Sequence, residues 1–257
     1  MTTYASVARG YKTRASTSMA ASAPRFQPEK LWNYEAGFKA DLADNRVRIN
    51  GAIFYSKWTD LQVQTNYLAD PNDISSAVTK TLNASSAKNK GVELEMQALV
   101  APGLQLGFGA GYLDSEFGSF PDAVLAGGTV VDLTGKRLPK TPKWSLNGMA
   151  DYSRQIADAY KGFVRLEWVY RSTVAGNLEA TAAPVLGLPS FPYQDPSYSI
   201  FNLRAGVSND NVSVNAYVDN LFDKSYFNGT SDHFGLAGIR LMPHPRIYGL
   251  KVIVKTN

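Results

Sequence analysis

The 257-residue sequence contains no cysteine, only two histidines and no apolar run that approaches the ~18 residues of a transmembrane helix. Without cysteine, the chain has neither a disulfide framework nor thiolate metal ligands. His233 and His244 lack the spacing to carboxylates on a rigid element that a metal site requires. We therefore interpret them as polar loop residues, with metal ligation beside Asp232 as the alternative, and we predict no metal site and no cofactor.

The sequence also contains no cluster of charges of one sign. Lys, Arg, Asp and Glu make up 19% of the residues, the formal net charge is +4, and the basic residues are scattered without a run of five. A nucleic-acid-binding stripe or tail is therefore not indicated. Residues 1–9 lack the apolar core of a signal peptide, so a secreted chain would have to be processed or belong to something longer.

What the sequence does contain is a period of two, which is typical of strands rather than helices. Short turns alternate with long polar loops at 13–30, 66–88, 117–142, 172–196 and 220–245. A soluble sandwich has no reason to place every long loop at one end, whereas an outer-membrane barrel has short periplasmic turns and long extracellular loops. The pattern predicts ten antiparallel strands at residues 4–12, 31–42, 47–58, 89–100, 104–116, 143–153, 161–171, 197–208, 212–219 and 246–255.

The two faces of each expected strand differ in polarity. In 47–58, one row contains Val47, Ile49 and Ile53, and the other contains Arg48 and Asn50. Unpaired charges are costly both in a packed core and against lipid, so the charged row must face water or a wet lumen. The apolar row then faces lipid, or a protein core if the chain is a soluble β-sandwich binding module. The inward charges expected on this basis are Lys39, Arg48, Arg165, Glu167 and Arg204.

Aromatic residues gather near the strand ends that meet the long loops. Amphipathic rings are typical of a membrane interface, where the apolar ring is buried and the polar tip stays wet. The sequence therefore predicts an aromatic girdle on the extracellular side. Its expected members are Trp32, Trp58, Trp144, Tyr34, Tyr55, Tyr112, Tyr198 and Tyr226.

No pattern in the sequence indicates catalysis. Gly107, Gly109 and Gly111 lie inside an alternating strand without a following helix, so they do not form a dinucleotide-binding loop. We expect a smooth inward row there, where another backbone or a ring approaches. The pairs Glu93 with Glu95 and Glu35 with Asp41 are interpreted as solvated or salt-bridged carboxylates, because glycosidase chemistry needs carboxylates that oppose each other across a cleft. The prediction is that the protein is not an enzyme.

Six motifs resemble those of one family. Asn220-Leu221-Phe222-Asp223 with Tyr226 resembles the "NLFD-x-x-Y" signature near the C-terminus of TonB-dependent outer-membrane receptors. The other five resemble that family's strand and loop segments and follow in its order, at residues 4–12, 28–39, 90–95, 137–142 and 245–250. The resemblance covers the whole chain. The last residues, 254–257, depart from the family, which usually ends in an aromatic residue.

The resemblance implies a barrel of twenty-two strands with an N-terminal plug in its lumen. Residues 1–257 would supply the last ten strands, an antiparallel up-and-down transmembrane β-barrel segment without plug or TonB-coupling box. The implied function is energy-coupled uptake of a scarce ligand, such as a ferric siderophore, across the outer membrane. The implied partners are outer-membrane lipid, the plug and remaining strands, TonB through the intact receptor, and an unidentified small molecule or metal chelate.

Two further expectations follow for a member of this family. The inward charges would line the lumen and meet the plug through ion pairs, or simply form a hydrated wall. Ligand-contact candidates in the outer loops are Phe191, Tyr193, Tyr226, Phe227, His233 and Phe234, with packing of the loops against themselves as the alternative. A passive or structural barrel of ten self-closing strands is the remaining alternative to a fragment of a larger barrel.

Overall fold

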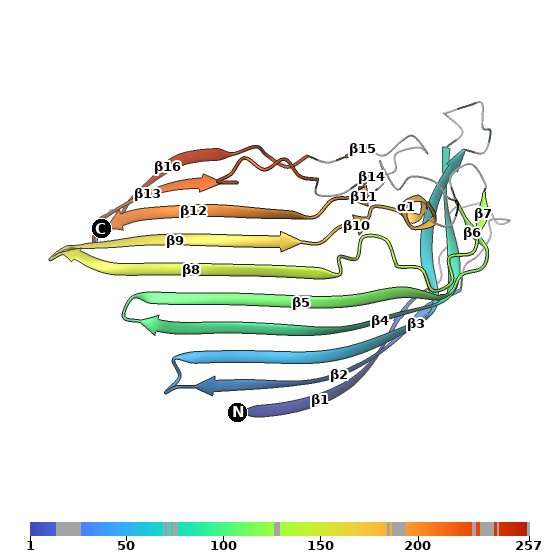
Figure 1. Ribbon diagram of the computed structural model, residues 1–257, viewed down its shortest axis with the longest axis horizontal. Coiled ribbons are helices and arrows are strands. Elements are labelled where there is room, and N and C mark those ends of the chain that lie inside the picture. Colours follow the sequence, from blue (N-terminus) through green and yellow to red (C-terminus); the bar gives the residue numbers. More distant parts are fainter. Residues whose placement is uncertain are drawn as a thin grey trace.

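The structure is a computed structural model that describes residues 1–13, 27–68, 70, 73, 77–125, 129–183, 186, 194–227, 230–231, 239–240 and 242–255. Ten long strands form one antiparallel sheet, and they follow one another in chain order. Figure 1 shows them side by side, with short turns and both chain ends on one side and the long connections on the other. The predicted all-β class and the ten strands are confirmed.

The ten strands of the sheet are β1 (Thr2–Lys12), β2 (Glu29–Leu42), β3 (Val47–Leu68), β4 (Ala77–Ala101), β5 (Leu104–Ser119), β8 (Trp144–Ala157), β9 (Tyr160–Arg171), β12 (Tyr198–Ser208), β13 (Val212–Asp219) and β16 (Ile247–Val254). The long connections contain β6 (Ala123–Val124), β7 (Val130–Val131), β10 (Val174–Ala175), α1 (Leu178–Ala182), β11 (Gln194–Asp195), β14 (Thr230–Ser231) and β15 (Ile239–Arg240). Among the described residues, no helix has the length and apolar character needed to cross a membrane.

One expected loop is largely strand. The segment 66–88 was expected to be a long loop, but β3 and β4 stay paired out to Leu68 and Ala77. Backbone pairing needs no apolar side chains, so this hairpin continues where the apolar alternation fades. That alternation marks only the part of a strand that faces an apolar medium. The loop prediction for 66–88 is therefore wrong.

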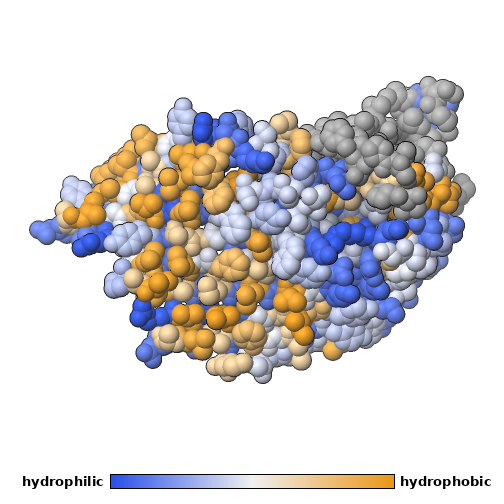
Figure 2. Space-filling view, viewed as in Figure 1, coloured by the Kyte–Doolittle hydropathy of each residue, from blue (hydrophilic) through white to orange (hydrophobic). Residues whose placement is uncertain are grey.

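The sheet has a polar face and an apolar face. Cross-strand register aligns Ala36, Ile53, Val92, Tyr112 and Trp144 on the apolar face. Large side chains on this face are exposed, for example Ile53 at 60% and Leu250 at 75%. Figure 2 shows hydrophobic residues gathered over the strands, with hydrophilic residues toward the turns and the loops.

The expected alternatives to a larger barrel can be compared with this architecture. A soluble sandwich would place the strands in two packed sheets and bury the row that contains Ile53, and neither is observed. A self-closed ten-strand barrel would pair β1 with β16. In the described part of the chain, β1 and β16 are instead the two ends of the strand order, so the sheet is open.

The hydrophobic core lies at the long-connection end of the sheet, where the outer parts of β4 and β5 meet the connections. We call this region the loop cap and define it by its buried residues, Ala84, Phe117, Phe120, Ala123, Leu125, Val131, Leu133, Leu178 and Ala182. Phe117 and Phe120 pack with ring centroids 5.1 Å apart. Figure 1 places β6, β7 and α1 together at the long-connection end of the sheet. The loops around 117–142 and 172–183 thus pack against each other.

Candidate functional site

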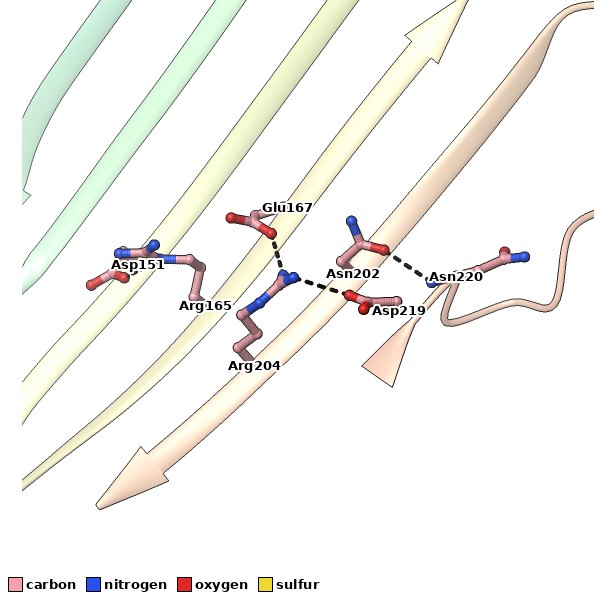
Figure 3. Close-up of polar contacts among 7 residues, drawn as sticks. All are labelled: Asp151, Arg165, Glu167, Asn202, Arg204, Asp219 and Asn220. Carbon is pink, nitrogen blue, oxygen red and sulfur yellow. Dashed lines mark hydrogen bonds and ion pairs between the residues drawn. The ribbon is translucent and has the colours of Figure 1, made fainter. Parts of the chain in front are cut away.

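A ladder of ion pairs crosses the polar face from β8 to β13. Asp151 on β8 accepts a hydrogen bond of 2.6 Å from Arg165 on β9. Arg204 on β12 lies between Glu167 on β9 and Asp219 on β13, with 3.0 Å to Asp219 (Figure 3). These side chains meet because their strands are neighbours in register. Three of the five charges predicted from the sequence, Arg165, Glu167 and Arg204, therefore lie on one face and neutralise each other and nearby carboxylates.

The other two predicted charges lie on the same face at β2 and β3. Arg48 donates to Asp41 at 2.6 Å, close to a short turn. Lys39 lines an open groove of about 430 Å³ that spans β1 to β8. Glu95 lies in the same groove and accepts a hydrogen bond from Asn50 at 3.3 Å. The groove therefore contains charges of both signs.

The predicted smooth glycine row lies in this groove. Gly109 and Gly111 line it. A Cβ atom at Gly109 would lie 2.6 Å from the amide of Asn147, so glycine leaves the room that this side chain occupies. The neighbouring group is thus a polar side chain, and neither a backbone nor an aromatic ring closes on Gly109.

A second cluster lies at the long-connection end of the polar face. Arg171, the last residue of β9, lies over the ring of Tyr198 at 4.9 Å and 3.7 Å from the buried carboxylate of Asp195. Arg171 also donates to the carbonyl of Phe227 at 3.1 Å, and Tyr226 packs on Tyr198 with centroids 4.5 Å apart. Burial and the neighbouring Tyr198 raise the pKa of Tyr226 above its ordinary value.

Sequence reasoning singled out Tyr226 and Phe227 as ligand-contact candidates in the outer loops but missed Arg171, Asp195 and the inward position of Tyr198. The strand parity that placed Arg165 and Glu167 on the polar face would also have placed Arg171 there, since all three are odd-numbered residues of β9. Asp195 lies in a connection without periodicity, so no sequence pattern predicted its position.

The predicted girdle is partly correct. Trp32, Tyr34 and Tyr55 form a chain of ring contacts, with centroids 6.3 and 6.4 Å apart, and Tyr112 packs on Trp144 at 4.8 Å. These five rings lie on the apolar face. Assigning the other three to the girdle was wrong. Strand parity places Trp58 and Tyr198 on the polar face, and Tyr226 packs against Tyr198.

The segment 220–223 is a structural clamp at the exit of β13. Asn220 is buried and has a φ of 53°, a left-handed conformation that asparagine tolerates. Its side chain both accepts from the backbone N–H and donates to the carbonyl of Lys224, while Asn202 accepts from its backbone N–H at 2.9 Å. Asp223 accepts from the N–H of Arg246 at 2.9 Å, which ties the start of this connection to its end before β16.

Phe222 contributes differently. Its ring meets Phe201 edge-on at 5.3 Å, yet the residue is 69% exposed. It thus extends the apolar face at its rim. The motif positions the connection and contributes no reactive group.

The structure does not describe several of the residues that the sequence analysis singled out. Phe191, Tyr193, His233 and Phe234, with Asp232, lie outside the described residues, and His244 is exposed in the connection before β16. Among the described residues, no three His, Cys, Asp or Glu side chains gather as metal ligands would.

Residues 1–221 match the family model "TonB dependent receptor-like, beta-barrel". The chain belongs to the TonB-dependent receptor β-barrel family. Family members are outer-membrane receptors and transporters of Gram-negative bacteria, not enzymes. The resemblance carried by the six motifs is therefore confirmed.

The chain is similar to part of several named receptors. It is 26% identical over 237 residues to the metal-pseudopaline receptor CntO of Pseudomonas aeruginosa, which covers 91% of this chain and 29% of CntO. It is 27% identical over 247 residues to the pesticin receptor of Yersinia pestis, covering 89% of this chain and 31% of that receptor. The crystal structure of the ferric yersiniabactin uptake receptor FyuA from Yersinia pestis superposes with a TM-score of 0.71 at 22% identity, covering 97% of this chain and 34% of FyuA. The chain thus spans about a third of the length of these TonB-dependent receptors.

Proposed function

We propose that the chain forms the C-terminal ten strands of a twenty-two-strand TonB-dependent receptor barrel that takes up a scarce ligand, such as a ferric siderophore, across the outer membrane. The observation that carries the proposal is the family match over residues 1–221 on an open sheet with an exposed apolar face. The metal-pseudopaline and ferric yersiniabactin receptors among the similar proteins support a metal chelate as ligand.

The open sheet supports the presence of further strands. In hydrocarbon, each unpaired backbone group costs several kcal/mol, so β1 and β16 both need a neighbour. The remaining strands of the barrel supply these neighbours. The apolar face then contacts lipid, and the polar face lines the lumen that the plug fills.

The polar face offers two kinds of surface to a plug. The ladder from Asp151 to Asp219 satisfies its own charges, which suits a rigid, hydrated wall. In the described residues Lys39 forms no ion pair, and it lies in the open groove beside Asn50. We therefore propose that the groove makes the polar contacts with the plug, while the ladder maintains the shape of the wall.

The aromatic and cationic cluster around Arg171 suits the ligand. Tyr226 and Phe227 lie there beside Tyr198, at the end of the polar face that the long connections surround. A phenol donor and a guanidinium fit an anionic or aromatic chelate. Phe191, Tyr193, His233 and Phe234 remain proposed contacts of the same ligand.

Uptake by the complete receptor tests this function. Cells that depend on the receptor would be given a panel of ferric siderophores labelled with radioactive iron, with and without the TonB energy-coupling protein. We expect TonB-dependent accumulation of iron from at least one siderophore, and a higher KM for uptake in Tyr226→Ala. The matched control is Tyr248→Ala on the apolar face of β16. Uptake that persists without TonB, or a passive ionic conductance of the purified receptor, would contradict the proposal.

A further inference from the structure

Basic residues gather on three adjacent register lines of the apolar face. Register aligns Arg9, Trp32, Lys57 and Lys88 across β1 to β4. One register line nearer the turns, Lys90 aligns with Tyr55 and Tyr34, and one line nearer the loops, Lys30 aligns with Thr59. We call Arg9, Lys30, Lys57, Lys88 and Lys90 the cationic row.

Strand parity places the cationic row on the side that faces away from the lumen ladder. Trp32 and Tyr34 belong to the apolar face, and Lys30 shares their parity on β2. Lys57 shares the parity of Ile53 and Tyr55 on β3. The cationic row therefore points outward, toward whatever contacts the apolar face.

Only part of this charge is balanced within the protein. Lys88 pairs with Glu116 at 2.6 Å and Lys90 with Asp114 at 3.2 Å. Arg9 lies over the Trp32 ring at 5.3 Å. Within the described residues, Arg9, Lys30 and Lys57 have no carboxylate partner, and all three are exposed. Three positive charges thus remain for an external partner.

Along this face, an apolar row, aromatic rings and cations follow one another, in the same order as the acyl chains and the headgroup of a lipid. The row of Ile53 and Val92 is apolar, the next rows add the rings of Tyr55, Tyr34 and Trp32, and the cations follow. Acyl chains match the first layer, and a negatively charged headgroup matches the last. A soluble partner would instead leave the apolar row uncovered.

We propose that the cationic row binds phosphate-bearing headgroups of membrane lipids in the leaflet on the long-connection side. This inference rests on the proposed membrane-spanning function and adds a lipid site to it. Each basic residue near an anionic membrane surface strengthens attraction about fivefold. Arg9, Lys30 and Lys57 carry the site because their charges are not already neutralised.

The test uses the complete protein that contains this chain, purified in a neutral detergent. It is titrated with phosphatidic acid or with phosphatidylcholine of the same acyl chains, and bound lipids are counted by native mass spectrometry. The test variant is Lys30→Gln with Lys57→Gln. The control is Lys161→Gln with Lys251→Gln, which removes the same charge from the polar face near the short turns.

The proposal predicts tighter binding of phosphatidic acid than of phosphatidylcholine, weakened at least about fivefold in the test variant and unchanged in the control. Equal affinity for the two lipids, or equal loss in both variants, would overturn it. A protein that inserts into vesicles but shows no headgroup preference would refute the lipid site alone. A protein that stays folded in water without detergent would refute the proposed function itself.

Discussion

The sheet and the loop cap are stabilised in opposite ways. In the sheet, the large apolar side chains are exposed, as Ile53 and Leu250 are, and the ladder residues on the other face form ion pairs. In the loop cap, Phe117 is 1% exposed and Leu133 is fully buried. The loop cap therefore buries its apolar side chains, as a small water-soluble domain does. The sheet instead presents its large apolar side chains outward.

This difference identifies the solvent of each region. Burial in the loop cap is driven by the removal of apolar area from water, at about 25 cal/mol per Å². The sheet leaves its apolar area exposed, which is favourable only against hydrocarbon. One chain thus contains two regions built for two media, and substitutions should have opposite consequences in them.

The largest effect is expected in the loop cap. Phe117→Ala removes a fully buried ring and should destabilise the loop cap by about 3–5 kcal/mol. Hydrogen exchange of the complete protein in detergent should show faster exchange in residues 117–138 and little change in β9 and β12. Phe222→Ala is the control, because Phe222 is 69% exposed. Equal exchange in the two variants would show that the loop cap has no core.

A charge on the apolar face should come next. Ile53→Arg places a guanidinium against lipid and should lower the free energy of unfolding from bilayers by about 2–4 kcal/mol. The neighbouring Ala52→Arg points to the polar face beside Glu93 and should cost far less. Denaturant titration of both variants in vesicles measures the difference. If Ala52→Arg were the more damaging change, the two faces would be assigned the wrong way round.

The clamp at Asn220 fixes the exit of the sheet strand β13. Asn220→Ala loses two side-chain hydrogen bonds and strains the left-handed backbone, at a cost of about 2 kcal/mol in total. Asn220→Gly removes the same hydrogen bonds without the backbone strain and should be the milder change. Thermal unfolding of both variants separates the two contributions. Identical melting temperatures would mean that backbone strain at Asn220 contributes nothing.

The smallest effect is expected in the ladder. Arg204→Gln breaks contacts with Glu167 and Asp219, but these side chains are one-third or more exposed, so water screens the loss to about 1 kcal/mol or less. Denaturant titration in vesicles, with Tyr217→Phe as a neutral neighbour on β13, measures it. A loss as large as that of Phe117→Ala would show that the ladder is a buried core.

Period-two alternation predicted most of the sheet because one face of each strand is apolar and the other is polar. It found the row of Ile53 and the positions of Arg165 and Arg204. It failed in the outer part of the β3–β4 hairpin, where Ala84 is buried in the loop cap and Leu61 and Val63 pack against it. It also could not predict the loop cap, since Phe117 of β5 and Leu178 of α1 belong to one core cluster through tertiary packing, which strand alternation does not encode.

The candidate site divides in the same way. Arg165, Glu167 and Arg204 of the ladder occur at alternate positions of regular strands, so strand parity predicted them. The contact of Arg171 with Asp195 joins a strand end to a loop, and that juxtaposition exists only in the folded chain. The segment 220–223 was recognised from the sequence as a family motif. Only the structure shows its hydrogen bonds to Lys224 and Arg246.

The central claim is that the apolar face of the sheet contacts lipid and the polar face contacts water. Because this chain has no cysteine, a single cysteine can be placed in turn at each position from 49 to 55 of β3 in the complete protein and spin-labelled in vesicles. The account predicts that oxygen collisions peak at 49, 51, 53 and 55, and that collisions with a water-soluble nickel chelate peak at 50, 52 and 54. Collision rates without this alternation, or with the two reagents exchanged, would contradict it.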